Sequence, residues 1–124
     1  MNTEKKIQLK FEASWLSNKI IYFKYFDNVV IDLNDVKKML ELQIEMGVNE
    51  SVKRIVHAGR HTTITSEARE YVEQNKPKVT AEAFILYGLH QKILFDFYYK
   101  VRKHKNPLKS FNKLSSAIKW IERF

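Results

Sequence analysis

Residues 52–72 carry the sequence VKRIVHAGRHTTITSEAREYV, from Val52 to Val72. Arg54–Ala58 predicts a short strand, and Gly59 falls in the loop that follows it. Thr65 and Ser66 form a hydroxyl pair that opens a helix, predicted from about Ser66 to Gln74. A strand, a loop and a helix in this order are the repeating unit of an α/β sheet, so this stretch decides the fold class.

The segments before this stretch predict a β-hairpin and a helix. Polar and apolar residues alternate from Ile7 to Leu16, and Ile20–Phe26 is rich in aromatic and β-branched residues that favour strands. Asp32 is the expected N-cap of a helix that Gly47 ends. Its expected apolar face consists of Leu33, Val36, Leu40 and Ile44.

The segments after it predict two more strands and two more helices. Ala83–Tyr87 is a continuous apolar run, as in a strand covered on both faces of a parallel sheet. A helix follows from Leu89, and Leu108–Phe111 predicts an edge strand because Pro107 precedes it. Asn112 is expected to cap the last helix. The inward side chains expected on the long helix are Ile93, Leu94, Phe97, Tyr98 and Val101.

The element order is therefore ββαβαβαβα, which predicts an α/β fold in one domain over residues 1–124. We expect a mixed sheet that starts with an N-terminal hairpin and has a mostly parallel core, with helices packed on it. No apolar run approaches the roughly 20 residues that span a bilayer, and the N-terminus lacks a signal-peptide pattern. The chain has no cysteine, which excludes disulfides and thiolate metal sites. We expect a cytoplasmic protein.

Several segments in this order resemble the STAS domain, the fold of bacterial anti-sigma-factor antagonists. The similar segments are Ile64–Tyr71, Ala81–Gly88, Asn106–Phe111 and Ala117–Ile121. The resemblance is closer to small stand-alone bacterial STAS-like proteins of unknown function. It implies a non-enzymatic protein-interaction or regulatory module.

Antagonist-type STAS domains carry Asp-Ser-Ser-Gly at the start of the helix after the central strand, and its first Ser is phosphorylated. The resemblance places Asp-Ser on Thr65-Ser66 here, while Glu67-Ala68 replaces Ser-Gly, so only the hydroxyl of Ser66 is retained. A helix N-terminus favours an anion, which Arg60 and His61 could help to hold. Alternatively, Thr65 is simply the N-cap and Ser66 the first helical residue.

Residues 92–124 hold nine Lys/Arg against Asp96 and Glu122, a net +7 of the chain's +8. Such a basic patch attracts nucleic acid, anionic lipid or an acidic partner, or is only a solvated face. We do not expect nucleic acid. The residues expected to form the patch are Lys92, Lys100, Arg102, Lys103, Lys105 and Lys109.

The remaining chemistry is sparse. His57 and His61 lie on a strand and a loop, so they do not share a helix face as a metal pair would, and we expect no metal site. There is no Gly-rich phosphate loop and no Gly-x-Ser-x-Gly elbow, so we expect neither a cofactor nor catalysis.

The first hypothesis is a self-associating interaction module, a homodimer that also binds an unknown protein partner around Ser66. A second is a binder of anionic surfaces that uses the basic patch. A third is a carrier of a small apolar ligand, which would require an internal pocket lined by Phe84, Leu94 and Phe97.

Overall fold

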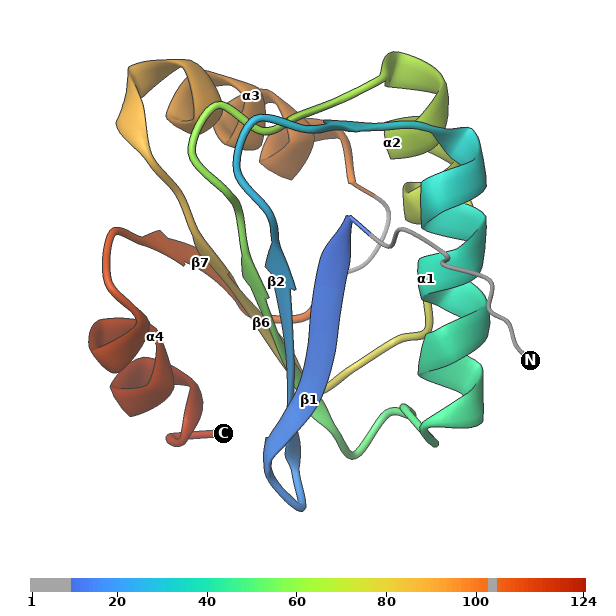
Figure 1. Cartoon of the computed structure of the whole chain (residues 1–124). Helices are drawn as coiled ribbons and strands as arrows, with labels where there is room; N and C mark the ends of the chain where they lie inside the picture. Colours follow the sequence, from blue (N-terminus) through green and yellow to red (C-terminus); the bar gives the residue numbers. More distant parts are fainter. Residues whose placement is uncertain (1–9, 103–104) are drawn as a thin grey trace, which may run out of the picture.

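A mixed five-stranded sheet forms the centre of the computed structural model, which describes residues 10–102 and 105–124. Its strands are β1 (Phe11–Ser17), β2 (Ile20–Tyr25), β4 (Lys53–His57), β6 (Ala81–Ile85) and β7 (Leu108–Phe111). They lie in the order β1-β2-β4-β6-β7 (Figure 1). β1 pairs antiparallel with β2, and all other neighbours pair in parallel. The predicted fold class, a hairpin followed by a parallel core, is confirmed.

Helices cover both faces of this sheet. They are α1 (Leu33–Glu45), α2 (Ser66–Asn75), α3 (Gly88–Val101) and α4 (Leu114–Ile121). Figure 1 shows α1 and α2 on one side and α4 on the other, with α3 across the carboxyl ends of the parallel strands. In the described parts of the chain, no helix has the length and apolar character that crossing a bilayer requires.

Side-chain alternation along the strands builds two cores. On one face, Ile21 and Phe23 pack with Met39 and Leu40 of α1. On the other face, the strand and helix residues in contact are Ile20, Ile55, Ala81, Ala83, Ile85, Ala117 and Ile121. The apolar character of β6 follows from this arrangement, because the strand is covered by helices on both sides.

The predicted start and end of α1 are confirmed. The Asp32 side chain accepts from the backbone N–H of Asp35 at 3.0 Å, and the Asp35 side chain accepts from that of Asp32 at 2.8 Å. This reciprocal pair is a capping box. Gly47 lies just beyond the helix with φ of 83°, a backbone conformation that glycine tolerates best.

The predicted apolar face of α1 is partly wrong. Ile44 is 71% exposed, whereas Met39 and Gln43 are buried. Since 3.6 residues make one turn, a face centred on Val36, Leu40 and Gln43 turns position 44 towards solvent. The sequence did not indicate this face, because the buried Gln43 is polar and a pattern of apolar residues leaves it out.

Other details also differ from the prediction, and the strand predicted over Ala83–Tyr87 lies at Ala81–Ile85. The N-cap of α4 is Lys113 rather than Asn112, and it makes no side-chain capping hydrogen bond. A second sheet pairs β3 (Val30–Ile31) with β5 (Thr63–Ile64), and strands of two residues are too short to show a periodicity. Ile7 and Leu9 of the predicted first strand lie outside the described residues.

The orientation of α3 was predicted only in part. Leu94 is half-buried and Phe95 is buried, but Ile93 and Phe97 are 56% and 58% exposed. The helix crosses the end of the sheet, so only a narrow strip of its surface meets other elements. The side chains of Tyr98 and Val101 lie outside the described part of the structure.

Candidate functional site

Thr65 caps α2, as predicted by the alternative in which Thr65 is simply the N-cap of this helix. Its Oγ1 accepts a hydrogen bond from the backbone N–H of Ala68 at 3.1 Å. Ser66 is exposed, and its Oγ accepts a long 3.5 Å hydrogen bond from the Arg69 guanidinium. A regulatory role of Ser66 stays a prediction.

Arg60 and His61 lie in the turn before β5. The Arg60 backbone N–H donates to Asp27 Oδ1 at 2.8 Å, and its guanidinium lies 4.8 Å from the centre of the Tyr87 ring. His61 is exposed with φ of 59°. Across residues 10–102 and 105–124, no hydrogen bond or ion pair joins Arg60 or His61 to Ser66. The anion site proposed for these residues therefore also stays a prediction.

The predicted basic patch extends along α3 and β7. Lys92 pairs with Asp96 at 2.9 Å, and Arg102 donates to the Asn106 side chain and carbonyl at 2.9 and 2.6 Å. Lys109 lies over the Phe111 ring at 5.5 Å. Lys100 and Lys105 are exposed, and Lys103 lies outside the described residues. Part of the patch thus has local partners.

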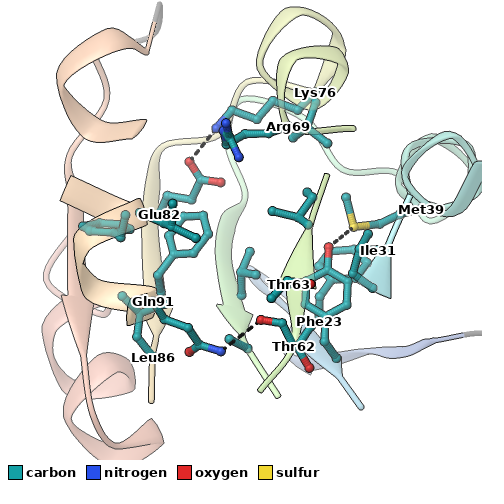
Figure 2. Close-up of a pocket in the computed structure, with 18 of the residues that line it drawn as sticks. Phe23, Ile31, Met39, Thr62, Thr63, Arg69, Lys76, Glu82, Leu86 and Gln91 are labelled. Atoms are coloured by element: carbon teal, nitrogen blue, oxygen red, sulfur yellow. Dashed lines mark hydrogen bonds and ion pairs between the residues drawn. The ribbon is translucent and has the colours of Figure 1, made fainter. Parts of the chain in front are cut away.

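An apolar pocket of about 170 Å³ lies between the sheet, α2 and α3 (Figure 2). Its apolar lining includes Phe23, Ile31, Val56, Ile64, Val72, Phe84, Leu94 and Phe95. The Phe84 and Phe95 rings pack with their centres 5.3 Å apart. Phe84 and Leu94 line the pocket as the ligand-carrier hypothesis required, whereas Phe97 faces solvent and Phe95 takes its place.

One end of the pocket holds a buried cluster of charges. Arg54 and Glu82 are register partners on neighbouring strands, and Arg54 Nε donates to Glu82 Oε2 at 2.9 Å. Arg54 Nη1 also donates to Gln43 Oε1 at 2.8 Å and to the Pro77 carbonyl at 3.1 Å. Lys76 Nζ donates to Glu82 Oε1 at 3.2 Å.

These contacts keep Glu82 ionised. Burial by itself raises the pKa of this carboxyl, but the charges of Arg54 and Lys76 and their hydrogen bonds outweigh burial. The resulting pKa is about 2, against an ordinary value of 4.5. The cluster thus supplies ionised polar groups to an otherwise apolar cavity.

Gln91 holds α3 against the loop at the opposite end of the pocket. Its Nε2 donates to the carbonyls of Gly59 and Thr62 at 2.9 and 3.2 Å, and its Oε1 accepts from the Tyr87 backbone N–H at 2.7 Å. Figure 2 shows the Gln91 side chain extending towards Thr62. A Cβ at Gly59 would collide with the Phe26 carbonyl oxygen, so only glycine allows the backbone at position 59 to lie this close to Phe26.

His57 has hydrogen-bond partners on both ring nitrogens, as expected for a structural histidine at a strand end. Nδ1 lies 2.6 Å from the Tyr22 hydroxyl, and Nε2 lies 3.1 Å from the Tyr87 hydroxyl. Burial, with a smaller contribution from the Lys24 charge, lowers the pKa of this histidine. In the described part of the chain, no group of three or more His, Asp or Glu side chains could hold a metal ion.

Sequence analysis missed the charged cluster and most of the pocket. A usable signal was present, because Arg54 and Glu82 are charged residues that directly adjoin apolar residues within their strands. Arg and Glu are almost never fully buried unless they are paired, so a buried residue of either type indicates a buried partner of opposite charge. Their pairing becomes visible only when β4 and β6 are placed side by side.

The fold, with its helix-covered parallel core, is STAS-like. A crystal structure of an uncharacterized protein of the DUF3478 family with a SpoIIAA-like fold, from Shewanella loihica PV-4, is similar with a TM-score of 0.64. The similarity covers 97% of this chain and 99% of that chain at 11% sequence identity, so it shows the fold alone. The STAS-like resemblance of the sequence is confirmed.

The chain belongs to the family described as "Domain of unknown function (DUF7793)", whose model matches residues 14–124. No curated protein matches the chain. Any function must therefore be argued from the site itself.

Proposed function

We propose that this STAS-like domain is a non-enzymatic binding module that takes one small, largely apolar molecule into the pocket between the sheet, α2 and α3. The cavity carries this proposal. Protein interiors pack as densely as organic crystals, and the few voids they contain seldom exceed the size of a water molecule. A partly open pocket of about 170 Å³ is far larger than such a void and has room for a small molecule.

The chemistry of the wall supports an apolar occupant. Aromatic and aliphatic side chains form most of the surface, including Val72, Phe84 and Leu94. An apolar cavity of about 150 Å³ binds benzene, so a molecule with one aromatic ring is of suitable size for this pocket. Sites with a mostly apolar wall and a few polar groups are typical of small-molecule binding.

The place of the pocket in the fold also supports ligand binding. Ala58 and Leu86 follow β4 and β6 directly, and both line the pocket. In open α/β sheets, ligands bind outside the carboxyl ends of the strands, where such loops meet.

A titration of the whole chain with toluene tests this function. Saturable shifts of backbone amide resonances in a ¹H–¹⁵N spectrum are expected around Val72, Phe84 and Leu94. Val72→Phe should fill the cavity and abolish them. The matched control is Val30→Phe, because Val30 is exposed on β3 and outside the pocket. Non-saturable shifts, or equal binding by Val72→Phe, would contradict the proposal.

A second candidate function is self-association through α3. Leu89, Ile93 and Phe97 are exposed at intervals of four residues, so they share one helix face. Two copies of α3 packed antiparallel about a twofold axis would cover this stripe. The adjacent Lys92–Asp96 pair offers both charge signs and is self-complementary in such a pairing.

Sedimentation velocity tests the second candidate. We expect Ile93→Glu to convert a dimer to a monomer, whereas Ile44→Glu, on the exposed face of α1, should leave the dimer unchanged. The test concentration of about 100 µM is on the order of the dissociation constant of a weak specific dimer. A wild-type chain that sediments as a monomer at this concentration excludes self-association as the function.

A further inference from the structure

We propose that the ligand of the pocket is a small amphiphile with one carboxylate, and that Arg69 is the residue that recognises this carboxylate. This inference rests on the proposed function, because it names the chemical class of the molecule that the pocket takes. The observations behind it are the balance of charge at the pocket, the contacts of Arg69 and the cavity volume.

The charges at one end of the pocket do not cancel. Arg54, Lys76 and Arg69 line the pocket and are cations, while Glu82 is the carboxylate among the lining residues. Glu73 lies 3.8 Å from Lys76 and supplies a second negative charge. Three cations thus face two carboxylates, and one positive charge remains.

The remaining charge belongs to Arg69. Arg54 contacts Glu82, and Lys76 contacts both Glu82 and Glu73. Within residues 10–102 and 105–124, the one hydrogen bond of the Arg69 guanidinium is the 3.5 Å contact with Ser66 Oγ. A distance of 3.5 Å is at the limit of hydrogen bonding, so most donors of this guanidinium are free for a ligand.

The position of Arg69 suits recognition of a ligand inside the cavity. It is half-buried on α2, three residues before Val72, which contributes to the apolar wall. Figure 2 shows Arg69 at the same end of the pocket as Lys76 and Glu82. A planar guanidinium can donate two parallel hydrogen bonds to a carboxylate, and such charge-assisted bonds are stronger than neutral ones.

The other ligand classes fit this end of the pocket less well. A cationic end group would lie beside Arg69 and Lys76 and be repelled. A wholly apolar ligand would desolvate the Arg69 guanidinium without replacing its water contacts, which costs free energy. A carboxylate both neutralises the remaining charge and pairs the free donors.

The cavity volume limits the apolar body of the ligand. At about 170 Å³ the cavity is slightly larger than one of about 150 Å³ that accommodates benzene. The body is therefore one aromatic ring or a chain of about six carbons. Phenylacetate has this size and carries one carboxylate, and phenylacetamide is its neutral counterpart of the same shape.

Both compounds should be titrated into the full chain and followed by ¹H–¹⁵N spectra. We expect the wild type to bind phenylacetate about tenfold more tightly than phenylacetamide, the effect of one charge-assisted contact. In Arg69→Gln the ratio should fall to about one, with phenylacetamide binding unchanged. Arg69→Lys, which keeps the charge but not the planar donor pair, should retain part of the preference.

Arg123→Gln is the matched control, because it removes the same charge from an exposed residue outside the pocket and should keep the tenfold ratio. Equal affinities in the wild type, or a tenfold ratio that persists in Arg69→Gln, would overturn the role of Arg69 while leaving the binding function intact. Failure of both compounds and of toluene to bind would instead overturn the proposed function together with this inference.

Discussion

The Thr65 hydroxyl satisfies one of the free N–H groups at the start of α2, whereas the neighbouring Ser66 hydroxyl faces solvent. Thr65→Ala should therefore lower the free energy of unfolding by about 1 kcal/mol, the usual effect of losing an N-cap. Urea unfolding at neutral pH measures this change. Ser66→Ala is the matched control and should stay within about 0.5 kcal/mol of the wild type. A larger loss for Ser66→Ala than for Thr65→Ala would contradict the capping assignment.

Glu82 is a buried residue whose ionisation stabilises the fold. Its pKa of about 2 lies below the ordinary 4.5, so the folded state favours the carboxylate more than the unfolded state does. The stabilisation is therefore complete above pH 4.5 and is lost as the pH falls towards 2. A difference of this size corresponds to about 3 kcal/mol. Unfolding free energies measured between pH 7 and pH 2 should show this loss.

Glu82→Gln should flatten that pH dependence. It also leaves Arg54 and Lys76 buried without their shared carboxylate, which costs about 3–5 kcal/mol at neutral pH. Glu41→Gln, an exposed position on α1, provides the control and should keep the wild-type profile. An unaltered acid limb in Glu82→Gln would show that other carboxyl groups are responsible.

At the scale of elements, Gln91 joins the start of α3 to the loop after β4. Gln91→Leu removes the donor shared by the Gly59 and Thr62 carbonyls and should destabilise the protein by about 1–3 kcal/mol. Hydrogen exchange should accelerate at residues 59–62 and 87–91, because the contact between the two elements is lost. Gln74→Leu, exposed on α2, should change neither measurement.

The helices also show how far an apolar pattern determines orientation. On α4, Ala117 and Ile121 are buried as their spacing predicted, because the apolar residues of that helix form one stripe. On α3, apolar residues occupy almost the whole circumference, so the pattern does not single out a face. Contact between Phe95 and Phe84 selects the inner face and leaves Ile93 and Phe97 outside.

At the scale of the whole molecule, an occupied pocket should stabilise the fold. A ligand that binds only the folded state, present at about 100 times its dissociation constant, adds about 2.7 kcal/mol. For a chain of this length the midpoint of thermal unfolding should rise by roughly 10 °C. Differential scanning calorimetry with phenylacetate measures this rise, and Val72→Phe should show none. A similar rise in Val72→Phe would place the binding elsewhere.

The sequence by itself determined the order of the four helices and of the five strands of the main sheet, the N-caps at Asp32 and Thr65, and the parallel core after an N-terminal hairpin. These features depend on neighbours within a few residues, where backbone preferences and side-chain periodicity act directly. The STAS-like fold follows from that order, because few topologies accommodate it.

Tertiary structure alone decided the pocket and its charges. Arg54 and Glu82 lie 28 residues apart, and they meet because β4 and β6 pair in parallel with these two residues in register. The volume of the cavity depends on side chains from Phe23 to Phe95, and no local pattern encodes the space that remains between them. A binding pocket is set by how elements pack together, so the sequence indicated Phe84 and Leu94 but not the rest of the site.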